Sequence, residues 1–292
     1  LVLRHINTEV PTVDSLGVPQ VLKDLVMERN GLVLVVGATG SGKSTTLAAM
    51  IDHRNTNAGG HILTLEDPIE FVPQHKKSIV AQREVGTDTK SFSAGMKSAL
   101  RESPDVILRG EVRDLETMEF AQKFANTGHL ALSTLHANNS ITTMERIFGF
   151  YPKDGIEQQA KRIAQNLRAI VCQRLVPGKV GGKVAAIEVL INTGYIADMI
   201  SKMELGGIKD AIERGGNYHM QSFDQHLVSL YFDGRITEET AIEFADSGSN
   251  VKIQIKTANA GKKIGSSENW GGALSLEPTE DDAGSIGDVV AE

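Results

Sequence analysis

The stretch that decides the fold is LVLVVGATGSGKST, residues Leu32 to Thr45. Its second part fits the pattern G-x-x-x-x-G-K-[ST], and the five apolar residues before it have the length of a buried strand. The residues that follow, 43–54, have the amphipathic pattern of a helix. In this context the glycines let successive N–H groups face an anion, and the positive end of the helix dipole points at the same place. The stretch therefore predicts a loop that binds nucleotide phosphates.

This loop supplies the predicted ligands of the nucleotide. Lys43 is expected to reach the β- and γ-phosphates, and the Ser44 hydroxyl to bind Mg²⁺, so ATP and Mg²⁺ are the predicted cofactors. Thr45 is expected to contact the α-phosphate. The full set of predicted nucleotide-binding residues is Gly37, Ala38, Thr39, Gly40, Ser41, Gly42, Lys43, Ser44 and Thr45.

Outward from the loop, short apolar runs alternate with helical patterns. The strand-length runs are 32–36, 61–65, 105–108 and 130–134, and the helical stretches are 43–54, 92–101 and 118–126. Such an alternation predicts an α/β fold with a mostly parallel central sheet.

The second half of the chain begins with two strand-like runs, 170–176 and 184–190. The glycine-rich residues between them mark either a domain boundary or a hairpin turn, and we favour the hairpin. The patterns beyond predict a C-terminal helical region, with Thr237 as the N-cap of its last helix. These helices are expected at 196–203, 207–214, 222–233 and 237–245.

Hydrolysis needs a carboxylate that orients a water molecule at the γ-phosphate. Asp105 and Glu111 flank one apolar run and would be roughly 20 Å apart if that segment is extended. Ligands of open α/β sheets lie beyond the carboxyl ends of the strands, which favours Glu111 as general base and leaves Asp105 as a polar residue that starts the strand. Glu66 and Glu70 follow another strand on the same side, where they hold Mg²⁺ waters or the nucleotide, or are simply solvated.

The same rule ranks the two histidines of GHLALSTLHAN. His136 follows its strand and is predicted to contact the γ-phosphate, whereas His129 precedes the strand and would act through a subunit contact. Phosphoryl transfer often takes a stabilising arginine from a neighbouring subunit. The candidates, for which surface salt bridges are the alternative, are Arg83, Arg101 and Arg113.

Composition limits the remaining possibilities. The 292 residues carry a net charge of −7, most of it in the segment 257–292, which is predicted to be an acidic, disordered tail. The near-neutral remainder argues against nucleic acid as a partner. No apolar run reaches the roughly 18 residues of a membrane span, so no membrane insertion is expected. The single cysteine, Cys172, excludes an internal disulfide or a cysteine-rich zinc site and predicts the cytoplasm.

Four blocks stand in a characteristic order: GATGSGKST, LEDPIEF, ILRGEVRD and GHLALSTLHAN. They resemble the Walker A, Asp, Walker B and His boxes of the secretion ATPases of the type II and type IV pilus class. The further blocks QREVGTDT, NLRAIVCQRLV and MQSFDQHLVSLYFDGRI resemble the twitching-motility branch, the PilT/PilU type, with 21–55 closest to the PilU type. The resemblance covers residues 5–256.

The resemblance implies a RecA-like P-loop NTPase core in a homohexameric ATPase that drives or assists type IV pilus retraction. It implies a position at the cytoplasmic base of the pilus, peripheral to the inner membrane, with a related pilus ATPase and a platform protein as partners. It assigns Glu111 as the catalytic glutamate, Glu66 and Glu70 to the Asp box, and His129 and His136 to the His box. It also implies that the three arginine candidates act across subunits.

The domains expected from the resemblance are 1–20, a linker remnant; 21–195, the ATPase core; 196–256, the helical region; and 257–292, the tail. Because the chain starts at Leu1 rather than Met, we expect it to be a fragment that lacks an N-terminal PAS-like domain.

The sequence departs from the family pattern at two places, and two alternative functions stay open. Arg109 occupies a Walker B position where the family has an apolar residue, so it either pairs with a nearby acid or lies at an open strand end. Residues 203–214 only loosely resemble the family's C-terminal helical motif. The alternative functions are a pilus assembly or secretion ATPase, which commonly carries paired CxxC motifs, and an accessory nucleotide-binding subunit with little hydrolysis of its own.

Overall fold

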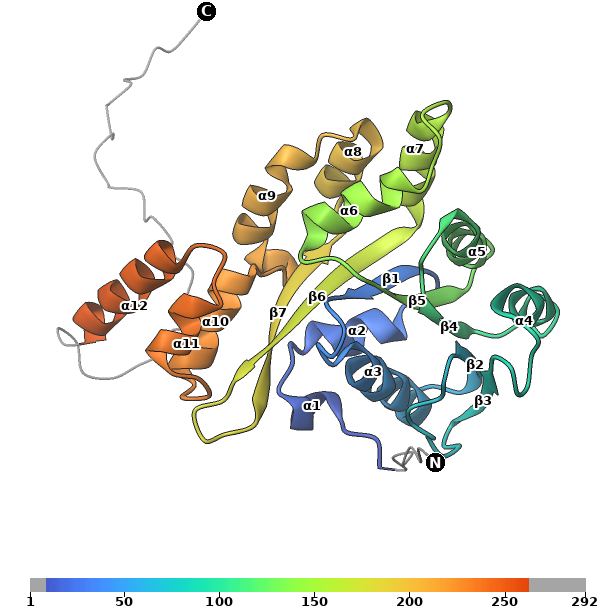
Figure 1. Ribbon diagram of the computed structural model, residues 1–292, viewed down its shortest axis with the longest axis horizontal. Helices are drawn as coiled ribbons and strands as arrows, with labels where there is room; N and C mark the ends of the chain where they lie inside the picture. The colour runs from blue at the N-terminus through green and yellow to red at the C-terminus, as the bar shows by residue number, and fades with distance from the viewer. Residues whose placement is uncertain (1–8, 263–292) are drawn as a thin grey trace, which may run out of the picture. The chain divides into compact units, whose positions relative to one another are not determined.

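The computed structural model describes residues 9–262 (Figure 1). In this part of the chain seven strands form one sheet, in the order β3-β2-β4-β5-β1-β6-β7. Only β7 is antiparallel to its neighbour, which confirms the predicted α/β fold with a mostly parallel sheet. The strands are β1 (Gly31–Val36), β2 (Gly60–Glu66), β3 (Ser78–Glu84), β4 (Val106–Glu111), β5 (Leu130–Leu135), β6 (Leu167–Pro177) and β7 (Lys183–Ile191).

Strands β1 and β5 are neighbours at the centre of the sheet, and every residue of both is buried. Helices cover both faces of such strands, which is why their sequences are continuous rather than alternating apolar runs.

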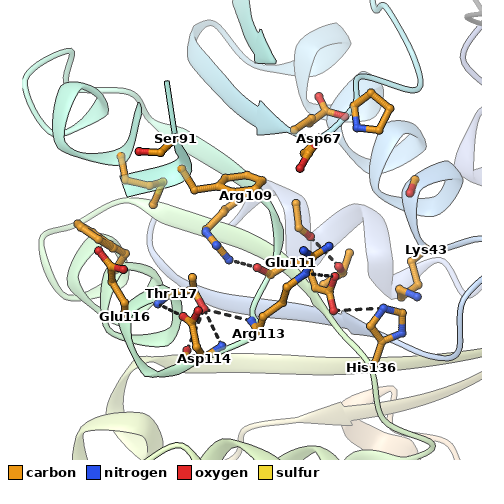
Figure 2. Close-up of a pocket in the computed structure, with 18 of the residues that line it drawn as sticks. Lys43, Asp67, Ser91, Arg109, Glu111, Arg113, Asp114, Glu116, Thr117 and His136 are labelled. Atoms are coloured by element: carbon orange, nitrogen blue, oxygen red, sulfur yellow. Dashed lines mark hydrogen bonds and ion pairs between the residues drawn. The ribbon is translucent and has the colours of Figure 1, made fainter. Parts of the chain in front are cut away.

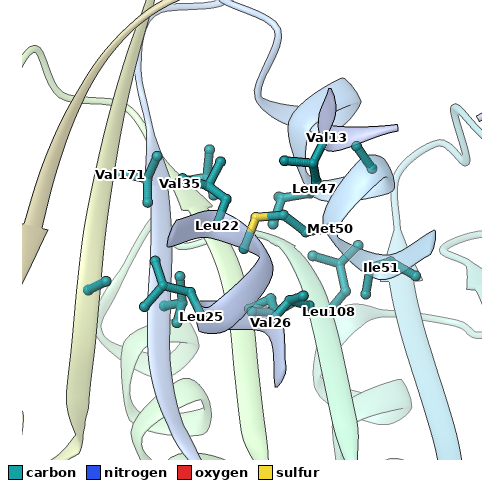
Figure 3. Close-up of a cluster of buried hydrophobic side chains, with 14 of the residues drawn as sticks. Val13, Leu22, Leu25, Val26, Val35, Leu47, Met50, Ile51, Leu108 and Val171 are labelled. Carbon is teal, nitrogen blue, oxygen red and sulfur yellow. The ribbon is translucent and has the colours of Figure 1, made fainter. Parts of the chain in front are cut away.

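One face of the sheet is covered by α1 (Val13–Leu16), α2 (Val21–Met27) and α3 (Lys43–Asn57). Leu22 of α2 and Met50 of α3 pack in one buried cluster with Val35 and Leu108 of the sheet (Figure 3). Because side chains alternate along a strand, Leu34 between two cluster members faces the other side. That side is packed by α5 (Leu115–Asn126), which contacts β1, β4 and β5.

Three more helices follow the strands. Helix α4 (Phe92–Ala99) contacts β2, α6 (Ser140–Gly149) contacts β6 and β7, and α7 (Ile156–Asn166) contacts α5. Asp114 and Asn139 cap α5 and α6, and each accepts a hydrogen bond from the third helical N–H. Both caps sit in the turn just after a strand, so they fix where these helices start beside the carboxyl edge of the sheet.

The predicted hairpin is confirmed. Strands β6 and β7 pair from Ala169 with Ile191 to Pro177 with Lys183. Gly181 and Gly182 have φ values of 90° and 72° in the connecting turn, a region that residues with a side chain rarely adopt.

The C-terminal helices are also confirmed, and Thr237 caps the fourth as expected. They are α8 (Gly194–Lys202), α9 (Ile208–Arg214), α10 (Phe223–Phe232) and α11 (Glu238–Glu243), with the short 3-10 turns η1 (Leu205–Gly207) and η2 (Gly216–Tyr218) between them. One boundary is wrong: α12 (Gly248–Lys262) runs through the start of the predicted tail, so 257–262 are helical. The rest of that tail, 263–292, lies outside the described residues.

The chain divides into two units, Leu1–Gln254 and Ile255–Glu292. In the first unit, α1 falls within the expected linker 1–20 and contributes the buried Val13 to the core. Residues 1–8 of that linker lie outside the described part. In the second unit, the described residues are the last turns of α12. Between residues 9 and 262, no helix is both long and apolar enough to cross a membrane.

Candidate active site

The phosphate loop connects β1 to α3 in the context that the sequence predicts. Gly42 caps α3 with a left-handed φ of 85°, and a Cβ there would come within 2.8 Å of the Gln173 amide nitrogen. A larger residue at this position is therefore strained and crowded, so the glycine is required by the turn itself.

Gln173 of β6 makes hydrogen bonds to the phosphate loop and to the first turn of α3. Its Nε2 donates to the carbonyl oxygen of Ser41 at 2.8 Å, and its Oε1 accepts from Thr46 Oγ1 at 2.7 Å. The side chain is 3% exposed. Sequence reasoning missed this residue, although a glutamine inside the apolar run IVCQRLV is a signal, because a buried amide needs partners.

Lys43 lies at the mouth of the loop with its ammonium group buried. Its Nζ donates to the carbonyl oxygens of Gly37 at 2.8 Å and Ala38 at 2.9 Å. Burial lowers the pKa of Lys43, and the nearby carboxylates of Glu111 and Glu70 act in the opposite direction. The ammonium group is thus held by the loop backbone, and the side chain lines the pocket in front of the loop.

A pocket of about 680 Å³ opens in front of the loop, beyond the carboxyl ends of β2, β4 and β5 (Figure 2). This volume lies within the range of about 300–1,000 Å³ that is typical of small-molecule sites. The predicted site residues that line the pocket are Thr39, Gly40, Lys43, Ser44, Glu66, Glu70, Glu111, Arg113 and His136.

The carboxylate of Glu111 is held by two cationic or polar side chains. Its Oε2 accepts from Arg113 Nε at 2.7 Å, and its Oε1 lies 3.2 Å from His136 Nε2. The other ring nitrogen of His136, Nδ1, lies 3.2 Å from the carbonyl oxygen of Gly37. The two nitrogens of the imidazole therefore face the Glu111 carboxylate and the Gly37 carbonyl oxygen, one on each side of the ring.

The Asp box acids line the same pocket as Glu111. Glu66 ends β2 and accepts from Thr64 Oγ1 at 2.7 Å and Gln82 Nε2 at 3.2 Å. Burial raises the pKa of Glu66. Glu70 lies four residues further on, in an exposed loop after Pro68, so it reaches the pocket from the loop rather than from the strand end.

Four predicted residues lie elsewhere or in a purely structural setting. Asp105 accepts from the backbone N–H of His61 at 2.8 Å, as expected of a residue that starts the strand. His129 lies at the opposite end of β5, with its ring against Phe124. Arg83 pairs with Glu102 at 2.7 Å, and Arg101 is exposed. In the described chain, Arg113 is thus the candidate arginine that contacts Glu111.

Arg109 follows neither alternative left open by the sequence. The side chain is buried, with 4% exposure, and no carboxylate in residues 9–262 lies within ion-pair distance of it. Its guanidinium instead donates to the main-chain oxygen of Glu111 and stacks over the ring of Phe92, with Cζ 4.7 Å from the ring centroid.

The phosphate loop offers one side-chain ligand for a Mg²⁺ ion that nucleotide phosphates would also hold. The described residues contain no group of three or more His, Cys, Asp or Glu side chains that could hold a metal alone. Ser44 offers one hydroxyl at the start of α3, and Mg²⁺ usually combines one or two protein ligands with phosphate oxygens and water. The donor set therefore fits a nucleotide-bound Mg²⁺.

The parallel sheet, the glycine-rich loop before α3 and the acids at the carboxyl edge define a P-loop nucleotide hydrolase. The model of the type II/IV secretion system protein family matches residues 1–192. The chain belongs to this family and is a P-loop ATPase.

Individual relatives agree with this assignment. The type IV pilus ATPase PilU of Pseudomonas aeruginosa is 50% identical over 97% of this chain and 74% of its own length. The retraction ATPase PilT of the same organism is 44% identical over 84% of this chain and 71% of its own. Among solved structures, the pilus retraction motor PilT with bound ADP superposes with a TM-score of 0.79 at 44% identity, over 86% of this chain and 71% of that one.

A second solved structure shares the fold at lower sequence identity. The Legionella pneumophila ATPase DotB has a TM-score of 0.73 at 29% identity, over 82% of this chain and 66% of that one.

Proposed function

We propose that the chain is a Mg-ATP-hydrolysing motor subunit that drives or assists type IV pilus retraction. The observation that carries the chemistry is the carboxylate of Glu111, fixed between His136 and Arg113 on the side of the pocket that Lys43 also lines. The observation that carries the biological role is the similarity to PilU and PilT over most of the chain.

In this mechanism the amides of the loop and Lys43 hold the β- and γ-phosphates. Bound Mg²⁺, which Ser44 would help to hold, neutralises phosphate charge. Glu111 orients the attacking water and accepts its proton, while His136 keeps the carboxylate next to the loop. Arg113 is 65% exposed along its side chain, so its free edge can contact either the γ-phosphate or a neighbouring subunit.

The proposed assembly is a homohexamer at the cytoplasmic base of the pilus, peripheral to the inner membrane, with a platform protein and a related pilus ATPase as partners. Two features support a partner for this surface. Arg113 is exposed beside the reacting centre, and Glu70 projects from an exposed loop at the rim of the same pocket. Charged groups at the edge of a nucleotide site are suited to completing it across an interface.

Expression in a piliated bacterium that lacks its own retraction ATPase tests the role. We expect the chain, but not its Lys43→Ala variant, to restore twitching. Restored pilus assembly in a second strain that lacks its own assembly ATPase, with no twitching in the first strain, would favour the alternative of an assembly ATPase. Nucleotide binding without phosphate release by the purified chain would favour the accessory subunit. Static light scattering with ATP tests the hexamer, and a monomer under all conditions would contradict it.

A further inference from the structure

Strand β4 contains a one-residue irregularity next to the candidate base. Arg109 pairs with Ser133 of β5, and Glu111 pairs with the next residue, Thr134, so Gly110 is the extra residue of a bulge. Inserting one residue reverses the face on which every later side chain of a strand lies. The bulge therefore places Glu111 and Arg109 on opposite faces, which regular alternation would not do.

The side chain of Glu111 lies on the face of the sheet that α3, the helix after the phosphate loop, covers. Thr134 alternates with Leu132 and Leu130, both in the cluster packed against α3. Helix α3 begins at Lys43. The bulge thus turns the carboxylate of Glu111 toward the nucleotide side of the sheet and leaves Arg109 on the side of α4 and α5.

Three side chains hold the bulged backbone. Ser133 Oγ donates to the carbonyl oxygen of Arg109 at 2.8 Å, and Thr134 Oγ1 donates to that of Gly110 at 2.6 Å. The carbonyl oxygen of Glu111 is the third acceptor, and its donor is Arg109 Nη1. Figure 2 shows the guanidinium of Arg109 turned toward the backbone of Glu111, which lies two residues further along β4.

The guanidinium is fixed in place by its surroundings. Phe92 at the start of α4 stacks on it at 4.7 Å, and its Nε has no hydrogen-bond partner in the described chain. Burial lowers the pKa of Arg109 to about 10, which leaves it charged at neutral pH. A buried charge without an ion pair is costly. The bond to the Glu111 carbonyl and the stacking on Phe92 offset part of this cost, and the carboxylates of Asp114, Glu111 and Glu116 favour the charge from beyond ion-pair distance.

We propose that Arg109 is a positioning residue for ATP hydrolysis: it fixes the bulged backbone at Glu111 and so keeps the carboxylate aimed at the attacking water. This inference rests on the proposed function, because it assigns Arg109 a part in the same reaction. It predicts that Arg109 acts on the rate of the chemical step through Glu111 and has little effect on nucleotide binding.

Two substitutions distinguish the positioning role of the Arg109 side chain from the effect of its positive charge. Arg109→Met keeps most of the side-chain volume and removes the donor, and Arg109→Lys keeps the charge without the planar group that stacks and reaches the carbonyl. We expect both to lower kcat for phosphate release by about 10- to 100-fold with KM within about 2-fold, since small displacements of a reacting group have effects of this size.

Arg168→Met is the matched control. Arg168 also starts from a strand and donates to a backbone oxygen, that of Asn30 at 3.1 Å, but at the opposite end of the sheet. We expect its kcat to stay within about 2-fold of wild type. Phe92→Leu, which removes only the stacking partner, should lower kcat less than Arg109→Met and in the same way.

Combination with Glu111→Gln tests the route of the effect. If Arg109 acts through Glu111, adding Arg109→Met to Glu111→Gln lowers the residual rate no further. A full additional loss in the double variant, an unchanged kcat in Arg109→Met, or a loss of ADP affinity measured by calorimetry would each overturn the inference. Wild-type hydrolysis that depends on Glu111 but not on Arg109 would overturn only this inference, whereas absence of wild-type hydrolysis would overturn the proposed function as well.

Discussion

The Nε2 atom of His136 lies 3.2 Å from Oε1 of Glu111, although Glu111 is the last residue of β4 and His136 follows the last residue of β5. The same ring reaches the carbonyl oxygen of Gly37 through Nδ1. His136 therefore joins the candidate base to the first residue of the phosphate loop, so a change in the loop can be transmitted to the carboxylate through one side chain.

Removing this link should slow hydrolysis. We expect His136→Ala to lower kcat by about 10-fold or more, because Glu111 then has one partner fewer and samples unproductive positions. His136→Asn, which can still donate to Gly37 but cannot reach Glu111, should resemble the alanine variant. His53→Ala serves as the control in the phosphate-release assay, because His53 lies on α3, the helix that follows the phosphate loop, and does not line the pocket. Equal rates for all three variants would show that the link is not used.

Gln173 should control nucleotide affinity rather than chemistry. Gln173→Leu has a similar volume but loses both hydrogen bonds to the loop, so we expect about 10-fold weaker ADP binding by calorimetry and a stability loss of about 1–3 kcal/mol. Gln221→Leu loses a single bond to Ile187 away from the site and should keep wild-type affinity. Tight ADP binding by Gln173→Leu would show that the loop holds its shape without this support.

Phosphate release should depend on Mg²⁺ at every ATP concentration. Chelation is expected to abolish it, because Mg²⁺ neutralises the charge that develops on the phosphates during phosphoryl transfer. Ser44→Ala should raise the Mg²⁺ concentration for half-maximal rate by about 10-fold, since one of few ligands is lost. Ser229→Ala, on an exposed position of α10, is the control. An unchanged Mg²⁺ requirement in Ser44→Ala would remove this residue from the metal site.

Stability should fall in acid through His226. Its Nδ1 accepts from the backbone N–H of Ile187 at 2.8 Å, and burial lowers its pKa from 6.5 to about 4. Between these values the unfolded chain binds a proton that the folded chain does not, so folding stability is lost as pH falls from 6.5 toward 4, by on the order of 3 kcal/mol.

The control for this prediction is His226→Asn, which keeps an acceptor near the same place and does not titrate. Urea unfolding at pH 7 and pH 5 should show a smaller loss for this variant than for wild type. A parallel loss in both proteins would assign the acid sensitivity to other groups.

The sequence alone predicted the features that are local or depend on strand direction. The run 32–36, the loop after it and the order of Asp105 and Glu111 along one strand followed from apolar pattern and the rule for strand ends. Strand β3 was missed because it lies at the edge of the sheet, where only Ser78 and Val80 of its residues are buried and Ile79 is 66% exposed.

What could not be predicted depends on where side chains reach in space. Gln173 touches the loop from a strand more than a hundred residues away in the sequence. Arg83 lies near the acids in sequence but turns to Glu102. The bulge at Gly110 requires the register between β4 and β5, which no single-strand pattern contains. The partners of Arg109 follow from that register.

In the proposed mechanism, Glu111 activates water at a phosphate held by the loop. The most direct test measures phosphate release and ATP affinity on the same preparation of Glu111→Gln, which keeps the shape and removes the base. We predict a kcat lower by about 100-fold or more, with ATP affinity within about 3-fold of wild type. Hydrolysis of ATP by Glu111→Gln at the wild-type rate would show that Glu111 is not the catalytic base.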